Sequence, residues 1–201
     1  MKKRTNKALL VIDMQKGSFG PDTPRFDTSG IISRINQLSS LFKTCQLPVI
    51  FIQHDGSGSG QFEKFNKDWE ILDELVVQNT DITIDKFAND GFYHSNLEKT
   101  LDQLEIGELY ITGCATDFCV GATIQSALSK DYRIVVVSDA HTTADRPGLT
   151  ADQVIDHYNW VWQNMIPTLG YIEVKCTEHI INEMNSTNFA GENNKETKLS
   201  L

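Results

Sequence analysis

Six short apolar runs recur along this chain of 201 residues, and most of them are continuous rather than alternating. Continuous runs of this length are typical of strands that are covered on both faces, as in a parallel sheet. Segments with helical spacing separate most of the runs, so the connections have room for crossover helices. The pattern predicts an α/β fold, a three-layer αβα Rossmann-like sandwich around a six-stranded, mainly parallel sheet. The predicted strands cover residues 8–12, 48–52, 81–86, 109–111, 133–137 and 171–175.

Helix signals fall between these runs. An apolar stripe from Ile31 to Cys45 stops at Pro48, and Ser95 to Glu98 and Thr150 to Gln153 both have the form of a capping box. A short helix or turn is expected around 69–75, and a short helix around 180–181. From residue 184 the chain becomes polar. We therefore predict one domain over residues 1–183 and a polar, flexible tail over 184–201.

Composition excludes some classes of function. A net charge of −9 and a pI near 5.0 argue against nucleic acid as a partner, because phosphate binding needs basic patches. The apolar run at 8–12 is too short for a signal peptide or a membrane span, so we expect a cytoplasmic protein without a membrane partner. The four cysteines show no C-x-x-C spacing, which suits a reducing compartment.

Chemically useful side chains stand where the predicted strands end. In parallel sheets, sites form at the carboxyl ends of the strands. Cys119 follows the fourth strand and is expected in the first turn of a helix, with Thr116 as its N-cap and a depressed thiol pKa. A buried cysteine that acts only as a small hydrophobe is the alternative. The other strand-end residues are Asp13, His54, Asp55, Lys86, Asp139 and His141.

Three blocks of this sequence together resemble the signature blocks of the isochorismatase-like cysteine hydrolases. They are Val11-Ile12-Asp13-Met14-Gln15, Asp85-Lys86-Phe87 with Asn89-Asp90-Gly91-Phe92, and Gly113-Cys114-Ala115-Thr116-Asp117-Phe118-Cys119-Val120. The resemblance covers residues 7 to about 180. It implies a catalytic triad of Asp13, Lys86 and Cys119 and a cis peptide between Cys114 and Ala115. It also suggests a homodimer or a larger homo-oligomer.

The implied triad is chemically coherent. A cysteine attacks a carbonyl as thiolate, so a base must take its proton and a positive field must stabilise the anion. Asp13 suits the base and Lys86 the field. The backbone N–H groups of Ala115 and Cys119 are candidates for an oxyanion hole. The expected reaction is hydrolysis of a C–N bond in an amide, lactam or ureido group of a small molecule through an acyl-enzyme, without a cofactor.

Other members of the family are expected to differ from this chain. Isochorismatases need no nucleophile, so Cys119 disfavours isochorismatase activity. Nicotinamidases carry a metal motif with a further histidine after the second strand, whereas His54 and Asp55 have no second histidine nearby; no metal site is predicted. The sequence looks more like the metal-free branch that includes streptothricin hydrolase, and the resemblance extends to the related N-carbamoylsarcosine amidohydrolase. Candidate pocket residues are Gln15, Phe19, His54, Trp69, Phe92, Tyr93 and Phe118.

Further alternatives stay open at this point. Cys119, His141 and Asp139 would form a different cysteine hydrolase, although His141 and Asp139 lie close together in an extended segment. A non-catalytic or thiol-redox protein of the same fold is a second alternative. A nucleotide-binding module is disfavoured, because no G-x-G-x-x-G follows the first strand and no P-loop motif is present.

Overall fold

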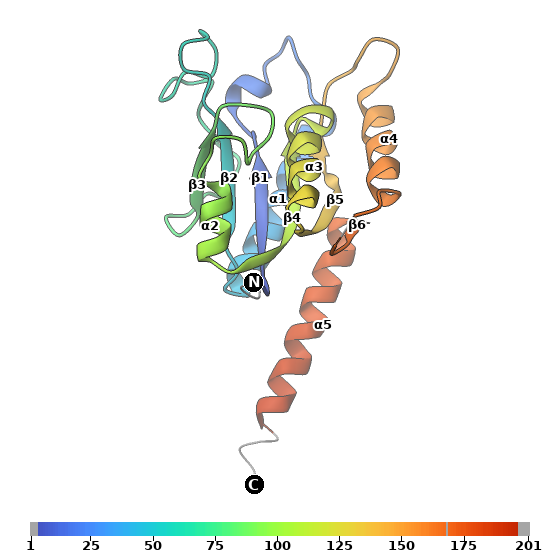
Figure 1. Ribbon diagram of the computed structural model, residues 1–201. Helices are drawn as coiled ribbons and strands as arrows, with labels where there is room; N and C mark the ends of the chain where they lie inside the picture. The colour runs from blue at the N-terminus through green and yellow to red at the C-terminus, as the bar shows by residue number, and fades with distance from the viewer. Residues whose placement is uncertain (1–3, 168, 197–201) are drawn as a thin grey trace.

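The apolar runs form one six-stranded parallel sheet (Figure 1). A computed structural model describes residues 4–167 and 169–196 of the chain, with side chains through residue 186. The strand order is β3-β2-β1-β4-β5-β6, and every neighbouring pair is parallel, which confirms the predicted fold class. The strands are β1 (Asn6–Ile12), β2 (Val49–His54), β3 (Ile82–Lys86), β4 (Ile106–Cys114), β5 (Arg133–Thr142) and β6 (Ile172–Lys175).

Helices cover both faces of the sheet. Leu9 and Val11 of β1 pack with α1 (Thr28–Thr44) and α5 (Thr177–Glu196), whereas Leu10 and Ile12 face the other side. Alternate strand residues point to opposite faces, so one continuous apolar strand supplies both cores. The second face is covered by α2 (Leu97–Gln103), α3 (Gly121–Ser129) and α4 (Ala151–Gln163).

Two sequence predictions of helix starts have different outcomes. The capping box at Thr150 is confirmed, since Gln153 accepts from the Thr150 N–H at 3.1 Å. The box at Ser95 is wrong: Asn96 is the N-cap of α2, and Glu98 forms an ion pair with Lys130 at 2.8 Å instead. A tertiary partner on α3's C-terminal side thus competes with the local cap.

Several element limits also differ from the predictions. Residues 69–75, predicted as a short helix or turn, form turns and an isolated bridge between Gln15 and Ile71, so the turn alternative is the right one. The short helix predicted around residue 180 is α5, which continues to Glu196 and projects from the body in Figure 1. Part of the predicted flexible tail, 184–196, is therefore helical, and 197–201 lie outside the described residues. The division at residue 183 stays a prediction.

The order of the strands reverses at β1. From β1 the chain adds β2 and β3 on one side of the sheet and then returns to add β4, β5 and β6 on the other side. In open parallel sheets this switch point opens a crevice at the carboxyl ends of the strands. Asp13 follows β1 at this point, with a left-handed φ of 49° and its N–H donating to Ile52 O at 2.8 Å. The fold thus delivers the β1, β3 and β4 ends to one edge.

Candidate active site

Asp13, Lys86 and Cys119 meet at the carboxyl edge of the sheet. Lys86 Nζ lies 2.7 Å from Asp13 Oδ2 and 3.3 Å from Cys119 Sγ. Its third contact is the Ala88 carbonyl at 2.9 Å, so the three donors of the ammonium group are used. The Lys86 side chain is fully buried and that of Asp13 is 8% exposed. Their mutual attraction is therefore weakly screened by water.

Asp13 keeps one oxygen in reserve. Its Oδ1 is buried and has no hydrogen-bond partner among the described residues. Buried polar atoms without partners are costly, so each one calls for an explanation, and a catalytic role is one of them. A carboxylate oxygen beside a thiol can accept the thiol proton.

The thiol of Cys119 carries that proton at neutral pH. Burial and the charge of Asp13 together raise the pKa of Cys119 to about 12, although Lys86 opposes both. The predicted depression of this pKa is therefore wrong, because the sequence showed the helix start but not the depth of burial or the carboxylate beside the sulfur. Ionisation must accompany attack rather than precede it.

The turn that carries Cys119 leaves β4 through a cis peptide between Cys114 and Ala115, as the resemblance implied. Thr116–Val120 then forms a π-helical turn before α3 begins, and the Ala115 carbonyl accepts from the N–H groups of Phe118 (3.0 Å) and Val120 (3.1 Å). Thr116 is not an N-cap as predicted: its hydroxyl bonds the His141 ring at 2.9 Å. The oxyanion-hole role of the Ala115 and Cys119 amides stays a prediction.

Asn89 is a neighbour of the Cys119 sulfur that was not predicted from the sequence. Asn89 Oδ1 lies 3.5 Å from Cys119 Sγ, and Asn89 is exposed. Asn89 lies three residues after Lys86, within one of the sequence blocks that resemble the family. This position was the signal that could have identified it. Among the described residues it brings a neutral amide to the open side of the thiol.

The predicted pocket residues fall into three groups: those that hydrogen-bond the backbone of neighbouring segments, those in the core and those on the surface. Gln15 is fully buried, and its amide bonds the backbone of His54 (3.0 and 2.8 Å) and the carbonyl of Trp69 (2.8 Å). Phe92 lies in the core against Tyr132. The remaining candidates keep a pocket role as a prediction only. Phe118 is 49% and Tyr93 57% exposed, while Phe19 and Trp69 are half-buried.

His54 stands beside the ion pair. It is in register with Lys86 across β2 and β3, so both side chains leave the same face of the sheet. Burial and the charge of Lys86 lower its pKa, and its buried Nδ1 has no hydrogen-bond partner in the part of the chain that the structure describes. Asp55 turns instead to Ser57, whose N–H it accepts at 2.9 Å. Within the described chain, no three His, Cys, Asp or Glu side chains gather as metal ligands would.

The alternative triad through His141 and Asp139 is wrong. His141 is buried, and its two ring nitrogens bond Thr116 and Asn159, so neither is free to serve Cys119. Asp139 bonds Thr177 on the opposite face of the sheet. Residues two apart in a regular strand share a face, so it is the irregularity of β5 between Val136 and His141 that separates the two side chains.

No helix in the described part of the chain is sufficiently long and apolar to pass through a bilayer.

Comparison with known proteins places this geometry in a family. A family model described as the isochorismatase domain matches residues 7–165. A ureidoacrylate amidohydrolase, RutB, of Pseudomonas syringae pv. syringae (strain B728a) is 30% identical over 66% of this chain and 69% of its own length. A streptothricin hydrolase of Streptomyces noursei is 28% identical over 70% of this chain, but the match spans only 51% of that protein.

Solved structures agree. The crystal structure of an isochorismatase family protein superposes with a TM-score of 0.78 at 29% identity, covering 85% of this chain and 98% of that one. A cysteine hydrolase from Pseudomonas syringae pv. phaseolicola 1448A gives a TM-score of 0.81, covering 92% and 95%. At 22% identity the second likeness supports the fold alone.

Proposed function

This chain belongs to the isochorismatase family, and from that membership and the site geometry we propose that it is a cysteine hydrolase that cleaves a C–N bond of a small amide, lactam or ureido compound. The contact of Lys86 Nζ with both Asp13 Oδ2 and Cys119 Sγ is the single observation that carries the proposal. It joins a nucleophile, a base and a cation in one buried cluster.

The proposed reaction begins with the thiol. Cys119 Sγ attacks the substrate carbonyl while its proton passes to the free Oδ1 of Asp13. The raised pKa of Cys119 makes this coupling necessary, since little thiolate exists beforehand. Lys86 stabilises the charge that develops on sulfur, and its ammonium group also holds Asp13 Oδ2 at 2.7 Å.

Collapse of the tetrahedral intermediate completes the first half. The C–N bond breaks, the Asp13 carboxyl gives its proton to the leaving nitrogen, and a thioester (a thiocarbamate for a ureido substrate) remains on Cys119. Water then attacks this carbonyl with Asp13 as the base, and the thiol is restored. Backbone N–H groups of Ala115 and Cys119 are the proposed donors to the oxyanion, a contribution of about 3 kcal/mol per donor.

The substrate class follows from relatives named for C–N hydrolysis, RutB for ureidoacrylate and the Streptomyces enzyme for streptothricin. The direct test measures ammonia and amine release from ureidoacrylate and a panel of amides and lactams. Wild type should hydrolyse at least one compound, and Cys119→Ala should lower its turnover at least about 10³-fold. Cys176→Ala is the matched control, because Cys176 is exposed and follows β6, the outermost strand on the opposite side of the sheet from β3. A compound cleaved equally well by Cys119→Ala would refute the nucleophile.

We also propose a homodimer or larger homo-oligomer in the cytoplasm. On α4, Val154, Ile155 and Trp162 are buried, whereas Trp160 is 64% exposed. Ile166, just beyond the helix, is 96% exposed. Light scattering of wild type and of Trp160→Glu tests the contact: a mass that exceeds one chain and falls in the variant is expected, and a monomeric wild type contradicts it.

A further inference from the structure

Strand β5 contains a bulge directly below the cysteine turn. Ile111 of β4 pairs with Val136, but Gly113, two residues on, pairs with His141. Four residues of β5 therefore stand opposite one residue of β4. Bulges re-aim side chains and occur next to active sites. This one brings His141 level with the last residues of β4.

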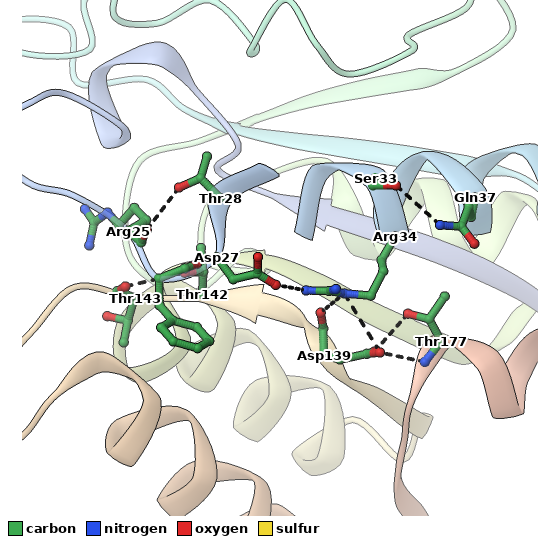
Figure 2. A network of polar contacts seen from close by, with 11 residues as sticks. Arg25, Asp27, Thr28, Ser33, Arg34, Gln37, Asp139, Thr142, Thr143 and Thr177 are labelled. Carbon is green, nitrogen blue, oxygen red and sulfur yellow. Dashed lines mark hydrogen bonds and ion pairs between the residues drawn. The ribbon is translucent and has the colours of Figure 1, made fainter. Parts of the chain in front are cut away.

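The bulge is clamped from both faces of the sheet. On the α1 and α5 face, Asp139 Oδ1 accepts from the Thr177 N–H (2.9 Å) and hydroxyl (2.8 Å), and Arg34 Nε donates to the Asp139 carbonyl (Figure 2). On the α4 face, Asn159 Nδ2 donates to the Ser138 carbonyl at 3.1 Å. The position of His141 is thus fixed by contacts with three helices.

These contacts determine which ring nitrogen of His141 carries hydrogen. Asn159 uses its amide nitrogen for Ser138, so the oxygen that lies 3.0 Å from His141 Nε2 is an acceptor. Nε2 must therefore be the donor, and Nδ1 accepts from the Thr116 hydroxyl at 2.9 Å. Burial lowers the pKa of His141 to about 4, against the hydrogen bond with Asn159, so the neutral ring persists at neutral pH.

We propose that His141 is a positioning residue of the hydrolase, which as the neutral Nε2–H tautomer holds the cysteine turn in place through the hydroxyl of Thr116. Thr116 follows the Ala115 amide and precedes Cys119 by three residues, so a shift at Thr116 moves the nucleophile relative to Lys86. The next turn residue is held in the same way, since Thr143 Oγ1 donates to Asp117 Oδ1 at 2.7 Å. This inference rests on the proposed role of Cys119.

Threonine variants separate positioning from simple packing. Thr116→Val removes the hydroxyl and keeps the shape, while Thr116→Ser keeps the hydroxyl. Thr112→Val is the matched control, because Thr112 is equally buried in β4 and its hydroxyl bonds the Leu10 carbonyl at 2.8 Å, away from the turn. Thr116→Val should lower kcat on ureidoacrylate, and the rate of Cys119 alkylation by iodoacetamide, by about tenfold to a hundredfold with KM within about twofold.

Thr116→Ser should recover both rates to within about threefold of wild type, and Thr112→Val should match wild type per folded molecule. Equal rates for Thr116→Val and Thr112→Val would overturn the proposal. If ureidoacrylate is not hydrolysed, the alkylation rates decide alone. Activity that survives Cys119→Ala would refute the role of Cys119 as nucleophile. It would not refute the hydrogen bond between His141 and Thr116, which the NMR measurement tests separately.

Nitrogen NMR of the histidine rings reports the tautomer without any substrate. Wild type at pH 7 should show a protonated Nε2 and an unprotonated Nδ1 for His141, assigned by comparison with His141→Gln. The Nδ1 signal should shift in Thr116→Val and not in Thr112→Val. A charged ring or a protonated Nδ1 at pH 7 would contradict the proposal.

Discussion

The two ends of the sheet each hold a lysine–carboxylate pair, and the pairs are built for different tasks. At the amino edge, Lys7 Nζ lies 3.2 Å from Glu108 Oε1, and Arg133 Nε lies 3.4 Å from the other oxygen. At the carboxyl edge, Lys86 lies 2.7 Å from Asp13 Oδ2. Both carboxylates are nearly buried, with 6% and 8% of the side chain exposed.

The difference lies in the remaining oxygen and the exposure of the lysine. Both Glu108 oxygens face cations, and its lysine is 40% exposed. Asp13 Oδ1 has no hydrogen-bond partner within residues 4–167 and 169–186, and its lysine has no exposure. A pair with its oxygens engaged has no acceptor to offer, whereas an unsatisfied oxygen beside a thiol can take a proton. Burial of an ion pair alone therefore does not mark an active site; a spare carboxylate oxygen near a thiol is what distinguishes Asp13 from Glu108.

Removal of the negative charge should lower turnover at one carboxylate and not at the other, and this is the largest difference expected between the two pairs. Asp13→Asn should lower turnover about 10²- to 10⁴-fold, because the amide cannot take the thiol proton. Glu108→Gln should keep turnover within about threefold and lower only stability. Steady-state kinetics, with circular dichroism as the check on folding, measures both. Equal losses of turnover would mean that Asp13 acts through structure.

The lysines should differ in stability. Lys86→Met leaves the buried Asp13 charge without a partner and should cost about 3–5 kcal/mol of unfolding free energy. Lys7→Met should cost less than about 1 kcal/mol, because Lys7 is partly exposed and its pair is screened. Urea unfolding followed by fluorescence gives both values. Similar costs for the two variants would show that Lys86 is not buried as described.

The stabilisation that comes from the ion pair of Lys7 and Glu108 should be lost at acid pH. Burial works to raise the pKa of Glu108, but hydrogen bonds from Tyr171 and Lys7 and the Lys7 charge hold it below its ordinary value. The unfolded chain then binds the proton first, so this stabilisation is present above the unfolded pKa and is lost as pH falls through the folded one. Unfolding free energy between pH 6 and 3 should fall less steeply in Glu108→Gln than in wild type. Parallel curves would contradict the assignment.

Metal removal should have the smallest effect. His54 and Asp55 do not converge with a third ligand among the described residues, so exhaustive chelation should leave turnover within about 20% of its starting value. Turnover before and after dialysis against a chelator, with elemental analysis of the protein, tests this. One tightly bound equivalent of zinc, iron or manganese lost together with activity would overturn it.

Much of the site could be predicted from sequence because it stands at strand ends. Asp13 and Lys86 close apolar runs, and Cys119 follows another, so a parallel sheet must bring them to one edge. The thiol pKa was predicted in the wrong direction, because burial and the neighbouring carboxylate depend on tertiary packing. Asn89 was missed for the same reason: an exposed loop asparagine gives no periodic signal.

The sequence by itself determined the parallel α/β sandwich, the family and the three residues of the cluster, since hydrophobic runs and strand-end chemistry are local properties of the chain. Tertiary structure decided what each residue does there. The β5 bulge could not be predicted, because the apolar run of that strand ends at the polar residue Ser138. This bulge places His141 beside Thr116, where the neutral ring accepts a hydrogen bond and does not act as a base for Cys119. Such roles depend on which groups from distant segments share a buried space, and on the dielectric there, and no local pattern records either.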